Sequence, residues 1–213
     1  MPTPIDAAMK QEGGDQPDVD REDDAVLIAL SKQGDREAFN RLVERYSTQI
    51  YNFAYRMTNS REDAEDIYQN AFIHAFRGIK SFRADAAFST WLYRIVRNAY
   101  LDEQKRRRAR PHTSLEDYIE TEDGAFTREV VDDAPSLDEV VQTNERRRVI
   151  QRAIAQLPER QREILVLYEM HGFSYEEIAG ILEINVGTVK SRLNRARNSL
   201  RDRLIPYKDL FDL

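Results

Sequence analysis

The chain has 213 residues, 33% of them charged, and a formal net charge of −6. This length accommodates one large or two small domains, and the mean hydropathy of −0.68 favours amphipathic helices over buried strands. The absence of cysteine excludes disulfides and cysteine-rich zinc sites and suits a reducing cytoplasm, where we expect the chain to act. No apolar run approaches the roughly twenty residues that cross a membrane, and the acidic N-terminus lacks the layout of a signal peptide, so no membrane insertion is expected.

Charge is unevenly distributed along the chain. Acidic residues are concentrated in the N-terminal tail through Asp24 and again between residues 111 and 143. Basic residues are concentrated at Lys105–Arg108 and along Lys190–Arg203. The net charge alone would argue against a nucleic-acid partner, but two basic segments separated by an acidic one reverse that interpretation.

The first elements in chain order are an acidic tail and two helices. Residues 1–22 hold Gly, Pro and acids with few apolar side chains, which predicts a disordered tail. A short helix is predicted from Asp24 to about Lys32, and Gly34 and Asp35 end it. A longer helix from Arg36 to about Met57 carries an apolar stripe at helical spacing: Phe39, Leu42, Val43, Tyr46, Ile50, Phe53 and Met57.

The next predicted helix begins after a cap at Asn59 and Ser60 and runs to about Phe76 or Ile79. Its face opposite the apolar side presents an isoleucine among carboxylates and amides, which suits a protein-docking surface. From spacing alone an ordinary solvated face explains this pattern better, and the acids of the first turn need no metal because they favour the helix dipole. The candidate docking residues are Asp66, Gln69, Asn70 and Ile73.

A basic stripe marks the helix predicted from Phe88 to about Arg108, after a loop at Lys80–Ala87. Cations at helical spacing along one side form an electrostatic footprint for phosphates. Aromatic side chains beside them could stack unpaired bases; Phe82 and Tyr93 are the candidates, whereas Phe88 and Trp91 are expected in the core. The stripe consists of Arg94, Arg97, Lys105 and Arg108.

Pro111 ends that helix, and the sequence up to Thr143 predicts an acidic linker. Helices are then predicted at Glu145–Gln156 and from Pro158 to about Met170. Because no segment shows a sustained period of two, we predict an all-α fold with two small helical domains, residues 23–110 and 144–204, joined by a flexible linker at 111–143. Residues 205–213 form a C-terminal tail without an assigned role.

The second domain ends in a helix-turn-helix pattern. Ser174 and Glu177 form a predicted capping box, and after a short turn Asn185 is a plausible N-cap for a basic helix. An amphipathic hairpin with a solvated basic face is the alternative. The apolar face of the basic helix consists of Val189, Leu193, Ala196, Leu200 and Leu204. The residues expected to contact DNA are Thr188, Lys190, Ser191, Arg192, Asn194 and Arg195.

Three motifs in this order resemble the extracytoplasmic-function (group IV) sigma factors of bacterial RNA polymerase. The first is Asp63–Ile67, with Gln69 and Phe72 after it, and the second is Phe88–Ile95. The third is the helix-turn-helix itself, with Tyr175–Ala179 followed by Gly187–Arg192. The resemblance extends from about residue 24 to residue 203.

The resemblance implies roles that spacing does not. The first domain would correspond to sigma region 2, and its face with Asp66, Gln69, Asn70 and Ile73 would dock on the clamp helices of core RNA polymerase. The loop Phe82–Ala87 and the helix after it would capture a flipped base of the minus-10 element and hold the melted strand. The second domain would correspond to region 4 and read the minus-35 element of promoter DNA. The acidic linker would thread the polymerase cleft, and no cofactor or catalysis is implied.

Two positions depart from the family pattern. Asn70 stands where many relatives carry an acid, and Asn194 where some carry an aromatic residue, which leaves the docking strength and the minus-35 sequence open. A stand-alone helix-turn-helix regulator is one rival, although it leaves the basic stripe unexplained. A helical nuclease using Glu62 and Asp66 is a remote second rival, because no catalytic motif appears and the three histidines share no ligand spacing.

Control by a partner is also implied by the resemblance. We expect an anti-sigma protein that covers Ile73 or the basic helix and competes with core polymerase in a one-to-one complex. A weaker alternative is that the acidic tail folds back on Lys190–Arg203 and inhibits in cis.

Overall fold

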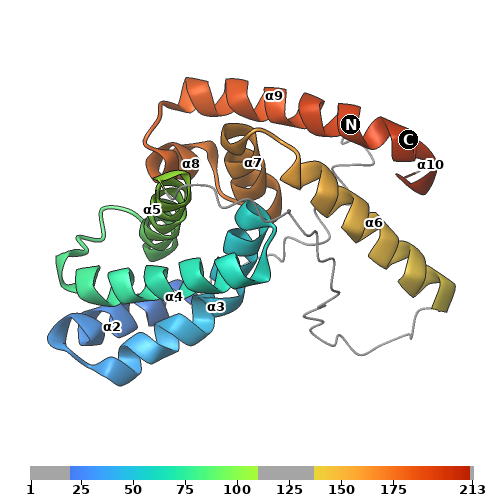
Figure 1. Ribbon diagram of the computed structural model, residues 1–213. Helices are drawn as coiled ribbons and strands as arrows, with labels where there is room; N and C mark the ends of the chain where they lie inside the picture. Colours follow the sequence, from blue (N-terminus) through green and yellow to red (C-terminus); the bar gives the residue numbers. More distant parts are fainter. Residues whose placement is uncertain (1–19, 110–136, 212–213) are drawn as a thin grey trace.

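The computed structural model describes residues 20–109 and 137–211, and every regular element in these ranges is helical (Figure 1). This confirms the all-α fold for the described ranges. The tail up to residue 19 and the linker from 110 to 136 lie outside them. The helices of the first half are α2 (Asp20–Gln33), α3 (Arg36–Thr58), α4 (Arg61–Gly78) and α5 (Phe88–Ala109), with a short 3₁₀ turn η1 (Ile79–Ser81) after α4.

Local capping sets the boundaries of α3 and α4. The Asp35 carboxylate accepts hydrogen bonds from the backbone N–H groups of Glu37 and Ala38, at 2.9 and 3.1 Å, and so begins α3. Asn59 ends α3 in the left-handed conformation, at φ +53°, and the Ser60 hydroxyl accepts from the N–H of Asp63 to begin α4. The apolar stripe predicted for α3 is buried as expected, apart from the half-buried Val43.

Helix α2 begins at Asp20, four residues before the predicted start. A buried acid explains how it is held, because the Asp24 carboxylate accepts from Arg45 at 2.5 Å and from the Tyr46 hydroxyl. Both donors lie on α3, so the ion pair and the hydrogen bond join the first two helices. A buried carboxylate with a charged and a neutral donor has the partners that burial requires.

The second half contains α6 (Leu137–Ala155), α7 (Glu159–Leu165), α8 (Tyr175–Leu182), α9 (Val186–Leu204) and α10 (Lys208–Phe211). Helix α6 starts at Leu137, so it includes residues 137–143, which the sequence analysis assigned to the linker. The helix predicted from Pro158 to Met170 divides into α7 and a π-helical turn, η2 (Val166–Met170), with the His171 N–H bonded to the carbonyl of Val166 at 3.2 Å.

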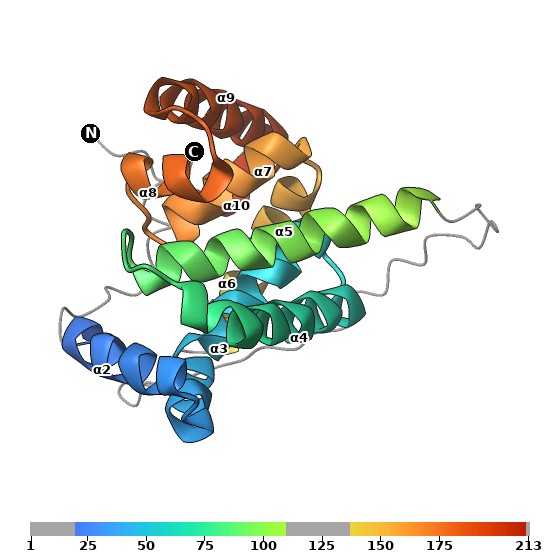
Figure 2. The same cartoon turned by 90° about the vertical axis from the view of Figure 1, so that its left-hand side faces the viewer.

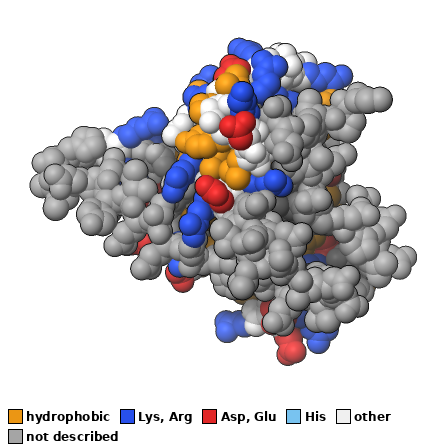
Figure 3. All heavy atoms as spheres, turned by 90° about the vertical axis from the view of Figure 1, so that its right-hand side faces the viewer, with side chains coloured by type: hydrophobic (Ala, Val, Ile, Leu, Met, Phe, Trp, Pro, Cys, Tyr) orange, Lys and Arg blue, Asp and Glu red, His pale blue; other side chains and the backbone are white. Residues whose placement is uncertain are grey.

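The C-terminal segment, predicted as an unassigned tail, is structured up to residue 211. A 3₁₀ turn, η3 (Ile205–Tyr207), leads into α10, which packs on α6 with Phe211 buried. On the side of the molecule where these helices lie, Lys and Arg side chains are visible along the top and at several places lower down (Figure 3). The C-terminal helices thus extend the packed second half.

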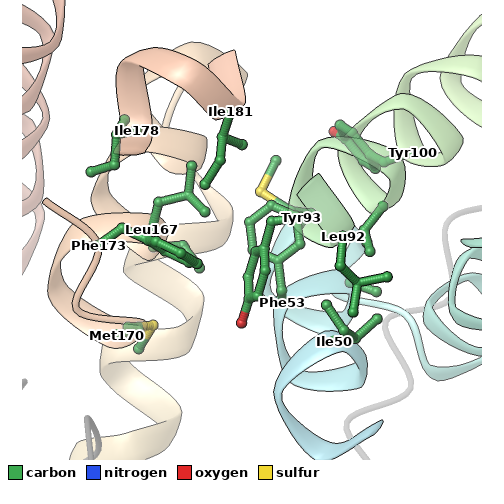
Figure 4. Packing of buried hydrophobic residues seen from close by; sticks show 14 of the residues in the cluster. Ile50, Phe53, Leu92, Tyr93, Tyr100, Leu167, Met170, Phe173, Ile178 and Ile181 are labelled. Atoms are coloured by element: carbon green, nitrogen blue, oxygen red, sulfur yellow. The ribbon is translucent and has the colours of Figure 1, made fainter. Parts of the chain in front are cut away.

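The two halves pack against each other and share one hydrophobic core. Helix α5 runs between α3 and α4 on one side and the second half on the other (Figure 2), and α3 also contacts α6, α7 and η2. Tyr93 of α5 and Phe53 of α3 point toward Leu167 and Phe173 of the second half (Figure 4). The prediction of two helical domains is confirmed, and the structure adds a contact between them that the sequence did not reveal, because buried apolar residues of α3 and α5 pack against both halves.

Candidate nucleic-acid interface

The helix-turn-helix is built by the caps that the sequence predicts. The Ser174 hydroxyl accepts from the Glu177 N–H at 3.2 Å, and the Glu177 carboxylate accepts from the Ser174 N–H at 2.9 Å, which completes the capping box of α8. The Asn185 side chain accepts from the N–H of Thr188 at 2.7 Å and begins α9. The predicted apolar face of α9 is buried along its whole length. The amphipathic pattern therefore fixes which face of α9 remains outside.

The outer face of α9 presents the predicted DNA-reading side chains to solvent. Lys190, Ser191, Asn194 and Arg195 are all exposed. Arg195 donates from Nε to the carbonyl of Ser191 at 3.2 Å, which orients its guanidinium along the helix surface. Thr188 instead uses its hydroxyl to reinforce the Asn185 cap at 2.8 Å, so its structural role in this arrangement is local. This face suits contacts to base edges in a major groove.

A polar groove of about 430 Å³ borders this face. It lies between the start of α7 and α9, and it is lined by Pro158, Arg160, Gln161, Thr188, Ser191, Arg192 and Arg195. Three guanidinium groups and no carboxylate line the groove, which favours an anion such as a backbone phosphate. The sequence interpretation missed Arg160 and Gln161, although their place directly after a helix-opening proline was visible.

Two tyrosines, Tyr168 and Tyr175, pack against basic side chains of α9. The rings of Tyr168 and Tyr175 stack with centroids 5.2 Å apart, and a hydrogen bond between them raises the pKa of Tyr175. The Lys190 ammonium lies 5.7 Å from the ring centre of Tyr175, and the Arg197 guanidinium lies 5.1 Å from that of Tyr168. Arg197 also binds the buried Glu169 at 2.6 Å. The Lys190 side chain therefore lies at the edge of the reading face, where its ammonium group contacts the Tyr175 ring.

The basic stripe of α5 is divided by the packing of the two halves. Arg94 donates two hydrogen bonds to the carbonyl of Gly180 in α8, from Nη2 at 2.6 Å and from Nε at 3.2 Å. Arg97 donates to the buried Glu163 of α7 at 3.1 Å. Lys105 and Arg108 remain exposed. The expectation of one continuous outward stripe is corrected: its first half faces protein groups because α7 and α8 pack there.

The two aromatic candidates for base stacking are buried in this arrangement, which corrects their predicted exposure. Tyr93 is only 1% exposed and packs its ring against Phe53 and Phe173, and burial raises its pKa well above the ordinary value. Phe82 packs edge-on against Phe88, with the Lys32 ammonium over its other side. For Tyr93 the sequence could not show this, because Phe173, one of the two rings that cover it, comes from the second half of the chain.

A buried histidine accompanies Tyr93 between the two halves. The Tyr93 hydroxyl and Nδ1 of His171 are 2.7 Å apart. Burial, helped by the nearby Arg56 charge, lowers the pKa of His171 to about 3. The hydrogen bond therefore joins a neutral phenol to a neutral imidazole. Glu163, beside Arg97, has its pKa raised because burial outweighs the attraction of that guanidinium.

The candidate docking face of α4 is largely open. Asp66, Gln69 and Ile73 are exposed and Asn70 is half-buried. Ile73 retains 47% of its surface, and Phe76 retains 42% while its ring packs edge-on on Phe39 at 5.0 Å. The sequence interpretation missed Phe76, which follows Ile73 by three residues and so shares its side of the helix. Two neighbouring apolar side chains strengthen the case for a docking surface over an ordinary solvated face.

The described residues offer neither a metal-binding cluster nor a membrane-spanning helix. Across residues 20–109 and 137–211 there is no group of three or more His, Asp or Glu side chains that could hold a metal ion. None of the helices in the same ranges has the length and apolar character needed to span a membrane.

Comparison with known families matches each half of the chain to a different family. Residues 42–110 match the family described as Sigma-70 region 2, and residues 147–200 match Sigma-70 region 4. The chain is 40% identical over 189 residues to the ECF RNA polymerase sigma-E factor of Escherichia coli, covering 86% of this chain and 95% of the relative. It is 39% identical over 186 residues to that of Haemophilus influenzae, covering 86% and 96%.

Solved structures of similar fold agree with these matches. The sigma factor RpoE of Bartonella quintana, solved with the anti-sigma factor NepR, superposes with a TM-score of 0.58 at 27% identity, covering 78% of this chain and 96% of that one. CnrH, solved with the cytosolic domain of CnrY, gives a TM-score of 0.62 at 24% identity over 86% and 98%, which speaks for the fold alone. Given the extent of its identity to the sigma-E factors, the chain belongs to the ECF family of RNA polymerase sigma factors.

Proposed function

We propose that this sigma factor binds core RNA polymerase, selects promoters through separate minus-35 and minus-10 contacts, and promotes strand opening without catalysis of its own. The observation that carries the proposal is the exposed reading face of α9 on a fully capped helix-turn-helix. The protein supplies recognition, and the polymerase supplies the chemistry. Because its proposed partner is RNA polymerase, we expect the protein to act in the cytoplasm.

The minus-35 contact divides into base reading and backbone anchoring. Lys190, Ser191, Asn194 and Arg195 lie where base edges would be met, since they share the solvent face of α9. Arg192, with Arg160 across the groove, lies where a backbone phosphate would be held. Phosphate contacts fix the register of a recognition helix but carry no direct sequence information.

The minus-10 contact is assigned to the first half. Lys105 and Arg108 are solvent-exposed cations at the end of α5, suited to the backbone of a melted strand. Arg94 and Arg97 lie earlier in α5 and so nearer in sequence to the loop Phe82–Ala87, which we propose receives a flipped base. In the packed arrangement those two guanidiniums are engaged by α7 and α8, so this contact requires the two halves to separate.

Docking on core polymerase is assigned to the outer face of α4. Ile73 and Phe76 would supply its apolar centre, and Asp66 and Gln69 a polar rim. We further propose an anti-sigma partner that covers this face or α9, supported by the NepR complex of the Bartonella quintana relative. The acidic tail proposed as an internal inhibitor lies outside the described residues.

Reconstitution with core polymerase tests the proposal. Genomic DNA is transcribed with the full chain and core enzyme, and the start regions of the transcripts are sequenced. Paired sequence motifs near minus-35 and minus-10 are expected, and they should be absent with core enzyme alone. A stand-alone regulator would instead bind DNA without polymerase and define no start sites. Cleavage of DNA by the purified chain would contradict the non-catalytic assignment.

A further inference from the structure

A chain of contacts runs from a buried carboxylate of η2 to the first outward cation of α9. Its members, each in contact with the next, are Glu169, Arg197, Tyr168, Tyr175 and Lys190. We call this set the tyrosine cluster. Glu169 and Tyr168 lie in η2, and Tyr175 begins α8, which lies beside the start of α9 (Figure 1). The groove between α7 and α9 is lined by other residues, so the cluster is a separate feature of the α9 surface.

The fixed end of the tyrosine cluster is the ion pair between Glu169 and Arg197. Glu169 is 9% exposed, and its Oε1 accepts from Nε of Arg197 at 2.7 Å and lies 2.6 Å from Nη2. A buried carboxylate needs such a partner, because an unpaired charge away from water is costly. The guanidinium is therefore held in place, with its Cζ 5.1 Å from the ring centre of Tyr168. Arg197 thus restricts the first of the two tyrosine rings.

The two tyrosine rings form a nearly parallel stack at the surface. The planes of Tyr168 and Tyr175 meet at 18° with centroids 5.2 Å apart, and a hydrogen bond joins the two side chains. An offset stack of this kind is a favoured arrangement of aromatic pairs. Both tyrosines are half-buried, whereas Phe173, in the same segment, is buried in the core. The stack therefore presents ring surface to side chains of α9 as well as filling space.

Lys190 and Arg197 lie on one side of α9, two turns apart. Their positions differ by seven residues, which at 1.5 Å per residue is about 10 Å along the helix. Each cation lies over one ring of the stack, and the Lys190 ammonium is 5.7 Å from the ring centre of Tyr175. Asn194 falls between the two cations at helical spacing and is exposed. The stack thus borders the side of α9 from which Lys190 and Asn194 would meet DNA.

A lysine reads a base well only when its side chain is held. The ammonium is a point charge on a flexible stem, so an unrestrained Lys190 would bind phosphate and base oxygens alike. The first turns of a recognition helix are the part that contacts base edges in the major groove. Guanine presents its N7 and O6 there as acceptors for a lysine. A ring that keeps the ammonium near one position favours this contact over the backbone.

We propose that Tyr175, supported by Tyr168, is a positioning residue for the minus-35 contact, which holds the Lys190 ammonium where it donates to a guanine. The inference rests on the proposed function and names residues that act through Lys190. A purely structural role would make the two rings matter for folding alone. A positioning role makes them matter for the preference at one base pair of the promoter.

Promoter mapping with the holoenzyme tests this role. Start-site sequencing with the wild type and with Lys190→Ala first identifies the base pair whose preference depends on Lys190. Tyr175→Leu should then reduce the preference at that base pair by about threefold, the size expected of an exposed cation–π contact, and spare the other positions. Tyr175→Phe keeps the ring, so it should keep the preference. Tyr207→Leu, a change of an exposed tyrosine beyond α9, is the matched control and should leave the motif unchanged.

The effects of the two changes should not add. With Lys190→Ala already present, Tyr175→Leu should alter no further base preference, because the side chain that it positions is gone. Fluorescence anisotropy of the free full-length chain on duplexes that carry or lack the identified base pair measures the same coupling. A further loss of selectivity in the double variant would mean that Tyr175 acts by another route, and it would overturn the proposal.

An unchanged base preference in Tyr175→Leu would also overturn the proposal, as would an equal loss at every position, which indicates a general defect of the domain. A wild-type motif in the Lys190→Ala holoenzyme would do the same, since Lys190 then reads no base. If circular dichroism shows Tyr175→Leu unfolded, Tyr168→Leu removes the support of Tyr175 from its other side and takes its place with the same expectation. A wild-type holoenzyme that yields no minus-35 motif would instead show that the proposed function itself is wrong.

Discussion

The two basic helices of the molecule, α5 and α9, face different surroundings. Helix α9 buries one apolar face and leaves Lys190, Asn194 and Arg195 in solvent. Helix α5 is covered on two sides, and Arg94 and Arg97 bind a carbonyl and a carboxylate of the second half. An arginine suited to phosphate is equally suited to the oxygens of its own chain. The two helices therefore carry similar basic side chains, but those of α9 face solvent and those in the first part of α5 are bound to the second half.

Under the proposed function, we expect this difference to assign the two helices to different stages of initiation. The reading face of α9 is available before polymerase binds, whereas the first part of α5 becomes available only when the halves separate. The contrast predicts that changes to α4, to α9 and to α5 have separable effects on polymerase binding, promoter selectivity and strand binding.

Disrupting the docking face of α4 should prevent the strand contacts of α5, which need polymerase, without weakening DNA binding by α9. Ile73→Asp places a charge where an apolar contact with polymerase is expected, and losing such a contact costs about 2 kcal/mol or more. Binding to core polymerase should fall by roughly 30-fold or more, while the free chain binds a minus-35 duplex as before. Pull-down and fluorescence anisotropy measure the two effects.

Ile205→Asp is the matched control for this change, because Ile205 is also an exposed isoleucine, at 56%, but lies beyond α9. Circular dichroism should show both variants folded. Polymerase binding retained by the Ile73→Asp variant would remove α4 from the docking role.

Changing the reading face should alter selectivity. If Arg195 contacts a base through both donors of its guanidinium, Arg195→Ala costs about 1–3 kcal/mol and relaxes the preference at one base position. Start-site sequencing with the variant holoenzyme would show this loss. Arg201→Ala, a change of an exposed arginine farther along α9, should leave selectivity intact. An unchanged minus-35 motif in the Arg195→Ala holoenzyme would contradict the assignment.

Mild acid should favour an open form, in which the two halves have separated, through protonation of His171. The pKa of His171 is about 3 when it is buried by Tyr93 and Phe53, and about 6.5 once it is exposed. The open form therefore binds the proton, and the closed form loses relative stability as the pH falls below about 6.5. Lowering the pH from 7.5 to 5.5 should favour opening about tenfold, read as an increase in the radius of gyration by small-angle X-ray scattering.

The raised pKa of Glu163 acts in the opposite sense, because burial favours its protonated form in the closed state. The His171→Asn variant separates the two effects, since only the histidine contribution disappears. An identical pH dependence in the wild type and in this variant would exclude His171 as the group that responds.

Removing the exposed end of the α5 stripe should have the smallest effect. Lys105 and Arg108 are expected to contact backbone, so replacing both with Ala should weaken open complexes at every promoter alike. The salt dependence of strand binding should flatten by a slope of about 1.4, for two contacts on a single strand. Arg106→Ala serves as the control, because Arg106 is an equally exposed and ion-paired cation that lies on a different side of α5 from the stripe. A defect limited to one promoter would indicate base reading instead.

Local patterns made much of the fold predictable. The caps at Ser174 and Asn185 and the buried face of α9 depend on residues within four positions of each other, and the structure confirms them. The burial of Tyr93 was not predictable in the same way, because Phe173 lies 80 positions away along the chain. Periodicity shows that a face is apolar or basic, but it does not show which distant element covers it.

The same limit applies to the candidate sites. Arg94 and Arg97 have the spacing of a phosphate-binding stripe, and nothing near them in sequence reveals Gly180 or Glu163 as partners. Arg160 joined the α9 groove only once α7 and α9 were packed together. The exposure of Ile73, in contrast, followed from the apolar face of its own helix and was predicted correctly.

The inward pairing of Arg94 and Arg97 has a consequence for how the free protein is distributed on a chromosome. Random DNA presents on the order of a million to a billion competing sites, and affinity for them grows with the number of phosphates neutralised. Withholding two guanidiniums reduces the salt exponent of that affinity by about 1.8. Fewer molecules are then titrated by bulk DNA, and the unbound pool remains available to encounter polymerase.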